Sequence, residues 1–113
     1  MVSKELVAAS SKPIVLSILS KGESYGYEII QKVRLLSCER LQWTDGMLYP
    51  VLHRLERAGL IKARWDKAES GRDRKYYHLT PKGQAELARE LEHWSTVSST
   101  IDGLQELSRC FSY

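Results

Sequence analysis

The chain has 113 residues and a net charge of +3, which predicts one domain and permits nucleic-acid binding without requiring it. Its two cysteines, Cys38 and Cys110, lie far apart, which favours reduced thiols over a disulfide framework or a metal site. No apolar run approaches the roughly 18 residues of a membrane span, and the first residues lack a signal-peptide pattern. We therefore expect a cytoplasmic protein with no membrane partner and no cofactor.

Two helices are predicted in the first part of the chain. Apolar residues with helical spacing run through residues 6–19, and Pro13 lies among them. Either this helix begins near Ser11 with Pro13 in its first turn, or a longer helix is kinked at Pro13. The turn signal that follows places Ser24 as the N-cap of a second helix over residues 25–36.

A third helix is predicted over residues 46–58, capped by Thr44 or Asp45 and ended by Gly59. Its apolar residues fall on one face, because their spacings of three, one and three match a helix: Leu48, Val51, Leu52 and Leu55. The opposite face is predicted to carry aromatic and basic side chains, with the first three within one turn of each other: Tyr49, His53, Arg54 and Arg57.

A β-hairpin is predicted next. Two short segments rich in β-branched and aromatic residues, 60–65 and 75–79, flank a polar stretch that contains Gly71. The glycine lets backbone approach a phosphate closely. Basic residues accompany it: Arg72, Arg74 and Lys75. Because strand residues alternate between faces, one of Tyr76 and Tyr77 is expected in the core, and the pattern leaves open which one.

A fourth helix is predicted from Pro81, with Thr80 as its N-cap, to about Ser108. The fold class is therefore mostly α with a small β-hairpin: a winged helix-turn-helix at residues 1–80 and a long C-terminal dimerisation helix at 81–113. In such folds the third helix enters the major groove and the hairpin reaches the flanking backbone. The predicted DNA contacts are Tyr27, Thr44, Tyr49, His53, Arg54, Arg57, Gly71, Arg72, Arg74, Lys75 and Tyr76. For Tyr27, packing within the helix-turn-helix and contact with a phosphate both remain open.

Four segments resemble the PadR family of transcriptional regulators. Residues 24–29 read SYGYEI, residues 46–56 read GMLYPVLHRLE, residues 59–61 read GLI and residues 70–83 read SGRDRKYYHLTPKG. The resemblance covers residues 13–113. It implies a winged-helix, dimeric repressor that an effector releases from DNA. A single C-terminal helix is similar to the family's short subgroup, which includes multidrug-responsive members.

The C-terminal helix carries a heptad-like apolar stripe: Leu87, Leu91, Trp94, Val97, Ile101, Leu104 and Leu107. A long helix with one apolar face needs a partner, and a two-fold homodimer satisfies it. Such a dimer matches a double-stranded operator with two-fold symmetry. We predict that the first six of these residues form the dimer interface.

Trp94 has two interpretations. It anchors the dimer interface, or, as the resemblance implies, it pairs with its symmetry mate and sandwiches a small aromatic effector. The effector contacts would then be Trp94, Leu91, Ser98 and Val15. Drug-responsive members tend to carry an acid about one turn after this tryptophan, where Ser98 stands here, which weakens the case for cationic drugs.

Two other classes of function compete with DNA binding. An enzyme is disfavoured because His53, His78 and His93 lack zinc-ligand spacing and no glycine-rich phosphate loop is present. The second alternative is a winged helix that binds proteins and not DNA. Basic side chains on both the third helix and the hairpin favour DNA over that alternative.

Overall fold

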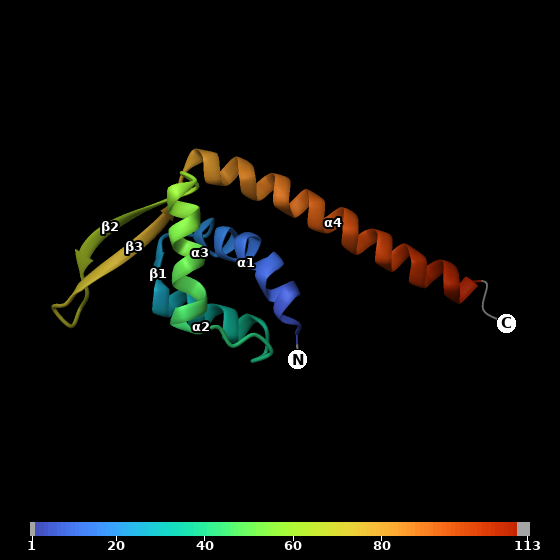
Figure 1. The fold of residues 1–113 in the computed structure, drawn as a ribbon, viewed down its shortest axis with the longest axis horizontal. Helices are drawn as coiled ribbons and strands as arrows, with labels where there is room; N and C mark the ends of the chain where they lie inside the picture. Colours follow the sequence, from blue (N-terminus) through green and yellow to red (C-terminus); the bar gives the residue numbers. More distant parts are fainter. Residues whose placement is uncertain (1, 111–113) are drawn as a thin grey trace.

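The computed structural model describes the backbone of residues 2–110 and the side chains of residues 2–107. It contains four helices and one small sheet (Figure 1): α1 (Lys4–Leu19), β1 (Ser24–Tyr25), α2 (Gly26–Leu36), α3 (Asp45–Arg57), β2 (Ile61–Lys67), β3 (Asp73–Leu79) and α4 (Pro81–Cys110). The strands are antiparallel in the order β1-β3-β2. The predicted fold class is confirmed, with one strand more than the expected hairpin.

Helix α1 adopts the longer of its two predicted forms. It begins at Lys4, where the Ser3 hydroxyl accepts a hydrogen bond from the amide of Leu6 at 3.2 Å. The helix continues through Pro13, whose ring lacks the N–H that would bond the preceding turn. Pro13 is buried, and the helix remains continuous across this position.

Residue Ser24 is not the helix cap that the sequence predicts. Ser24 and Tyr25 instead form strand β1 and pair with Tyr77 and Tyr76 of β3. The Ser24 hydroxyl donates a hydrogen bond to Glu28 at 2.6 Å, and no side chain caps α2 at Tyr25. The edge of β3 offers unpaired backbone groups, and two residues of β1 satisfy them.

Helix α3 matches its prediction closely. The Thr44 hydroxyl accepts a hydrogen bond from the amide of Met47 at 3.3 Å, which identifies Thr44 as the cap. Gly59 follows the helix with a φ of +76°, the left-handed conformation that glycine adopts at little cost. The four apolar residues of the predicted stripe are all buried: Leu48, Val51, Leu52 and Leu55.

The core gathers residues from α1, α2, α3 and the sheet, and it settles which tyrosine lies inside. Tyr77 is buried in this core, whereas Tyr76 is half-exposed. Leu87 of α4 also belongs to the core and is only 7% exposed. Leu87 was predicted in the dimer interface, but the first turns of α4 pack on α1 of the same chain. There Lys12 pairs with Glu86 at 3.5 Å and with Glu90 at 3.3 Å.

The junction between β3 and α4 is tightly packed. The Thr80 hydroxyl donates to the Gly59 carbonyl at 2.7 Å and accepts from the amide of Gly83 at 3.0 Å, as expected for the cap of α4. A Cβ atom added to Gly83 would lie 1.9 Å from the carbonyl oxygen of Leu60. The same oxygen accepts a hydrogen bond from the amide of Thr80 at 3.1 Å, so it has little freedom to move.

Beyond its first turns, α4 extends away from the rest of the protein (Figure 1), and the protein measures 65 × 29 × 21 Å. Five apolar side chains on this extension are between 49% and 56% exposed: Leu91, Val97, Ile101, Leu104 and Leu107. An apolar stripe of this length is unusual on a monomer's surface. None of the described helices is both long and apolar enough to span a membrane.

Candidate DNA-binding surface

Helix α3 presents one set of side chains directly away from the core. With 3.6 residues per turn, the positions opposite the buried stripe are those of Pro50, His53 and Arg57. All three are exposed. His53 and Arg57 therefore supply an imidazole and a guanidinium to anything that lies along the outer face of α3.

Tyr49 leans from α3 toward the hairpin. Its hydroxyl lies against Gly26, where an added Cβ atom would come within 2.7 Å of it. Tyr49, Tyr25 and Tyr27 line one depression, together with Trp65 and residues 73–75 of the hairpin. Tyr27 is 64% exposed at this edge, so its phenol is available for contact with a phosphate.

Arg54 lies on a different side of α3 from the one predicted. It lines a shallow cleft with Ala8 and Lys12 of α1 and with Glu90 of α4. Tyr49 and His53 are one turn apart and lie on neighbouring sides of α3, whereas Arg54 is rotated by about 100° from His53. The structure therefore separates Arg54 from Tyr49 and His53, with which the sequence grouped it.

The tip of the hairpin is a tight turn that ends in an exposed arginine. Gly71 has a φ of +85°, and the amide of Ala68 donates to the Arg72 carbonyl at 2.8 Å. Within the described residues, the Arg72 guanidinium has no ion pair or hydrogen bond. This cation is therefore free to contact a phosphate.

The next two basic residues of the hairpin are held against the protein. The Arg74 guanidinium stacks 3.9 Å from the centre of the Tyr25 ring, and the Lys75 ammonium lies 3.6 Å from the Glu56 carboxylate. Tyr76 packs edge-on against the same Tyr25 ring, with centroids 5.6 Å apart. An exposed ion pair is weak, so a phosphate can compete with Glu56 for Lys75.

Arg64 on β2 was not among the predicted DNA contacts, and two carboxylates, those of Glu23 and Asp66, balance its charge. It donates to Glu23 at 3.0 Å through Nε and also through its terminal nitrogen, and to Asp66 at 2.7 Å. These hydrogen bonds lower the pKa of both carboxyl groups. Glu23 is distant in sequence, so no local pattern reveals this ion pair, which fastens the hairpin to the segment before α2.

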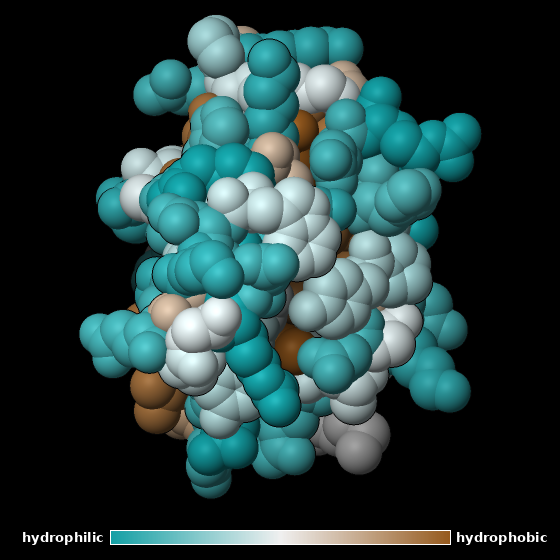
Figure 2. All heavy atoms as spheres, turned by 90° about the vertical axis from the view of Figure 1, so that its left-hand side faces the viewer, coloured by the Kyte–Doolittle hydropathy of each residue, from teal (hydrophilic) through white to brown (hydrophobic). Residues whose placement is uncertain are grey.

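The face that contains the hairpin is predominantly hydrophilic. Figure 2 shows charged and polar side chains over most of it, pale aromatic ones between them, and only small hydrophobic areas. Such a surface differs from a protein-binding patch, whose centre is depleted in charge. A polar surface of this kind fits an interface with DNA, which is more polar than one between proteins.

Comparison with known proteins gives the family. The model of the "Transcriptional regulator PadR-like family" matches residues 15–89. The chain belongs to the PadR family of transcriptional regulators. The "Transcriptional regulator Rv3488" of Mycobacterium tuberculosis is 32% identical over 102 residues, which is 90% of this PadR chain and 92% of that protein.

Solved structures agree with the PadR assignment. A transcriptional regulator from Clostridium thermocellum matches with a TM-score of 0.82 and 31% identity, over 91% of this chain and 97% of the other. A PadR-like regulator from Bacillus cereus matches with a TM-score of 0.79 and 30% identity, over 90% and 97%. The resemblance stated from the sequence is thus confirmed, as is the winged-helix fold.

A second surface of this PadR chain is an apolar groove of about 420 Å³ between α1, α2 and α4. Of the four predicted effector contacts, Leu91 and Trp94 line it, and Ser98 does not. Val15 is fully buried in the core, because α1 turns its neighbours Pro13 and Ile14 toward the groove instead.

Within the described residues of this PadR chain, no three histidine, cysteine, aspartate or glutamate side chains come together as a metal site. Cys38 is a free, exposed thiol, and the side chain of Cys110 lies outside the part of the chain that the structure describes.

Proposed function

We propose that this PadR regulator is a homodimeric, cytoplasmic repressor that binds a double-stranded operator with two-fold symmetry. The observation that carries the proposal is the outward placement of His53 and Arg57 on α3, beside a hairpin that ends in the unpaired Arg72. In this assignment α3 reads base edges and the hairpin contacts the flanking phosphates. Residues 1–80 act as the DNA-binding domain and residues 81–113 as the dimerisation helix.

Selection of bound duplexes from a random DNA pool tests the proposal. The enriched sequences should contain inverted half-sites about one helical turn, ~34 Å, apart. Binding of the selected duplex should weaken steeply with salt, since each phosphate contact releases counterions. Failure to retain any duplex at low salt would instead favour a winged helix that binds proteins.

Loss of either outward side chain of α3 should weaken specific binding. His53→Ala and Arg57→Ala each remove a group placed to contact a base or phosphate, and a good base contact contributes roughly 1–3 kcal/mol. Mobility shift with the selected operator measures the loss, and far-UV circular dichroism should stay unchanged because both residues are exposed. Arg54→Ala is the matched control, since Arg54 faces the α1 cleft, and its effect should be smaller. Parent-like affinity in both His53 and Arg57 variants would exclude α3 as the reader.

Removing the charge of Arg72 should lower the affinity for all DNA sequences by a similar factor. The slope of log affinity against log salt should flatten by about one unit for a lost phosphate contact. Arg89→Ala provides the control, because it also removes a positive charge but lies on α4, paired with Glu86 at 2.7 Å. A change of sequence preference in Arg72→Ala would mean that the hairpin reads bases, and an unchanged slope would mean that Arg72 contacts no phosphate.

We also propose that a small aromatic effector releases the repressor by binding at Trp94 and Leu91. The apolar groove that these residues share with Pro13 and Ile14 supports this role. Two such grooves would meet near a two-fold axis if α4 forms the interface. In such a dimer the effector would release DNA by changing the distance between the two α3 helices. Its effect depends on how much more tightly it binds the dimer with the changed distance than the dimer that fits the operator. If Trp94 is an interface anchor alone, planar aromatic compounds will leave its fluorescence unchanged.

A further inference from the structure

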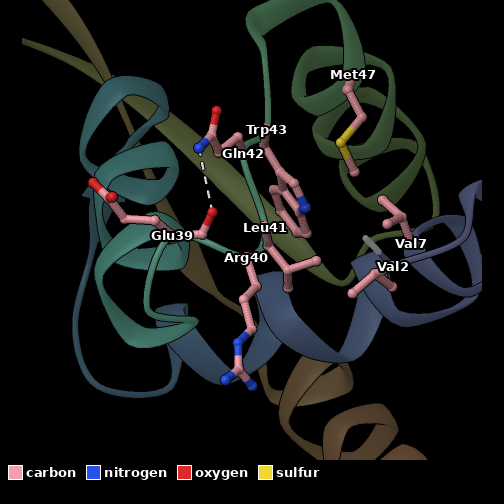
Figure 3. A pocket seen from close by; sticks show the side chains of 8 residues that line it. All are labelled: Val2, Val7, Glu39, Arg40, Leu41, Gln42, Trp43 and Met47. Carbon is pink, nitrogen blue, oxygen red and sulfur yellow. Dashed lines mark hydrogen bonds between the residues drawn. The ribbon is translucent and has the colours of Figure 1, made fainter.

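A larger cavity, of about 650 Å³, lies on another part of the protein (Figure 3). It opens between the start of α1, the loop from α2 to α3 and the first turn of α3. Its wall includes Val2, Val7, Leu41, Trp43 and Met47, and its rim includes Glu39, Arg40 and Gln42. The volume lies within the range of small-molecule sites, and the wall is mostly apolar, as it is in such sites.

The indole of Trp43 makes this cavity unusual. The residue is only 5% exposed, and its Nε1–H has no hydrogen-bond partner in the described part of the chain. In Figure 3 the ring lies among the lining side chains, with Nε1 on the edge that faces Val7 and Met47. Buried polar groups are nearly always hydrogen-bonded, and an indole can only donate. The missing partner is therefore an acceptor.

The neighbouring polar side chains do not supply that acceptor. The Glu39 side chain points away from the cavity in Figure 3, and its carboxylate lies 3.7 Å from Arg34. The Gln42 amide donates to the Glu39 carbonyl oxygen at 3.3 Å. Arg40 is a donor and extends away from the indole (Figure 3). Among the described residues no buried cation lies beside Nε1, so a charged ligand group would be poorly compensated by them.

We propose that this cavity binds a small, neutral, largely apolar molecule whose carbonyl oxygen accepts a hydrogen bond from Trp43 Nε1. The apolar part of the ligand lies against the aliphatic side chains of Val7, Leu41 and Met47, and its carbonyl oxygen faces the indole edge. This site is separate from the groove at Trp94, although Leu41 lines both.

The cavity adjoins the element that reads DNA. Trp43 directly precedes Thr44, the cap of α3, and Met47 belongs to the first turn of that helix. A ligand here contacts both α1 and the start of α3, and so it fixes the position of α3 relative to α1. The effect of this ligand on operator affinity rests on the proposed function. The binding of the ligand to the cavity does not.

The test follows the indole N–H resonances of the three tryptophans in the ¹⁵N-labelled full chain. Trp43→Phe assigns the Trp43 signal. Acetophenone is the probe. α-Methylstyrene is the control ligand, because it has nearly the same shape but carries a C=CH₂ group, which accepts no hydrogen bond, in place of the C=O. Acetophenone should shift the Trp43 signal to saturation, and α-methylstyrene should bind about tenfold more weakly, as expected for one lost hydrogen bond.

Val7→Phe fills the cavity and should abolish the acetophenone shift, while Trp94→Phe should leave it unchanged. The proposal is overturned if the Trp43 signal does not move, if the two probes bind equally, or if only the Trp94 signal responds. If Val7→Phe does not fold, the comparison of the two probes on the parent protein decides alone. The titration contains no DNA, so a failure of operator binding would leave its outcome unaffected.

Discussion

Gly83→Ala is expected to destabilise the protein more than alanine at any of its other glycines. The new Cβ atom would lie 1.9 Å from the Leu60 carbonyl oxygen and 2.9 Å from Leu79 Cδ1. The oxygen is fixed by the amide of Thr80, so relief requires α4 to move away from the end of β3. Overpacking of this kind costs typically 1–3 kcal/mol and occasionally more, and we expect about 3 kcal/mol here.

Urea denaturation measures this loss as a lower midpoint with an unchanged slope. Gly103→Ala is the matched control, because a Cβ atom there meets nothing within 4 Å. In the middle of α4, alanine should stabilise the helix by up to about 1 kcal/mol. Equal midpoints for Gly83→Ala and the parent protein would show that α4 does not pack against the Leu60 carbonyl in solution.

Leu91→Asp is expected to separate the proposed dimer into monomers. Leu91 is 49% exposed in the single chain and begins the uncovered apolar stripe of α4. A carboxylate at this position would be buried without a partner in the dimer, which disfavours association strongly. Operator affinity should fall by about 10²-fold or more, since the two half-sites are no longer bound by linked domains. Nonspecific binding, which depends on charge, should change much less.

Analytical ultracentrifugation reports the oligomeric state, and mobility shift with operator and random duplexes reports the two affinities. His93→Asp is the control, because it places the same carboxylate on α4 at an exposed residue outside the stripe. It should remain dimeric. A Leu91→Asp variant that stays dimeric would mean that another surface holds the two chains together.

Features that depend on short stretches of chain were predictable from the sequence. Thr44 as a cap, the buried stripe of α3 and the start of α4 at Thr80 and Pro81 all follow from side-chain type and spacing. The left-handed turn at Gly59 follows in the same way, because few other residues adopt that conformation readily.

Features that depend on distant partners were not predictable. Strand β1 exists because β3 offers it an edge, and Ser24 alone looks like a helix cap. Lys75 and Arg74 read as free charges until Glu56 and Tyr25 are placed beside them. The sequence shows that Trp43 precedes a helix, but only the packing of α1 shows that its N–H is buried without a partner.

The fastening of the hairpin has a consequence for how an operator is chosen. Strand β1 pairs with β3, Arg64 bonds Glu23 just before β1, and Arg74 stacks on Tyr25. We therefore expect the hairpin and the helix-turn-helix to move together, so that the distance between their proposed contacts on DNA varies little. In the proposed operator complex the duplex would adapt its groove width to this span. Base pairs that the protein never touches then contribute to selectivity through the stiffness of the DNA.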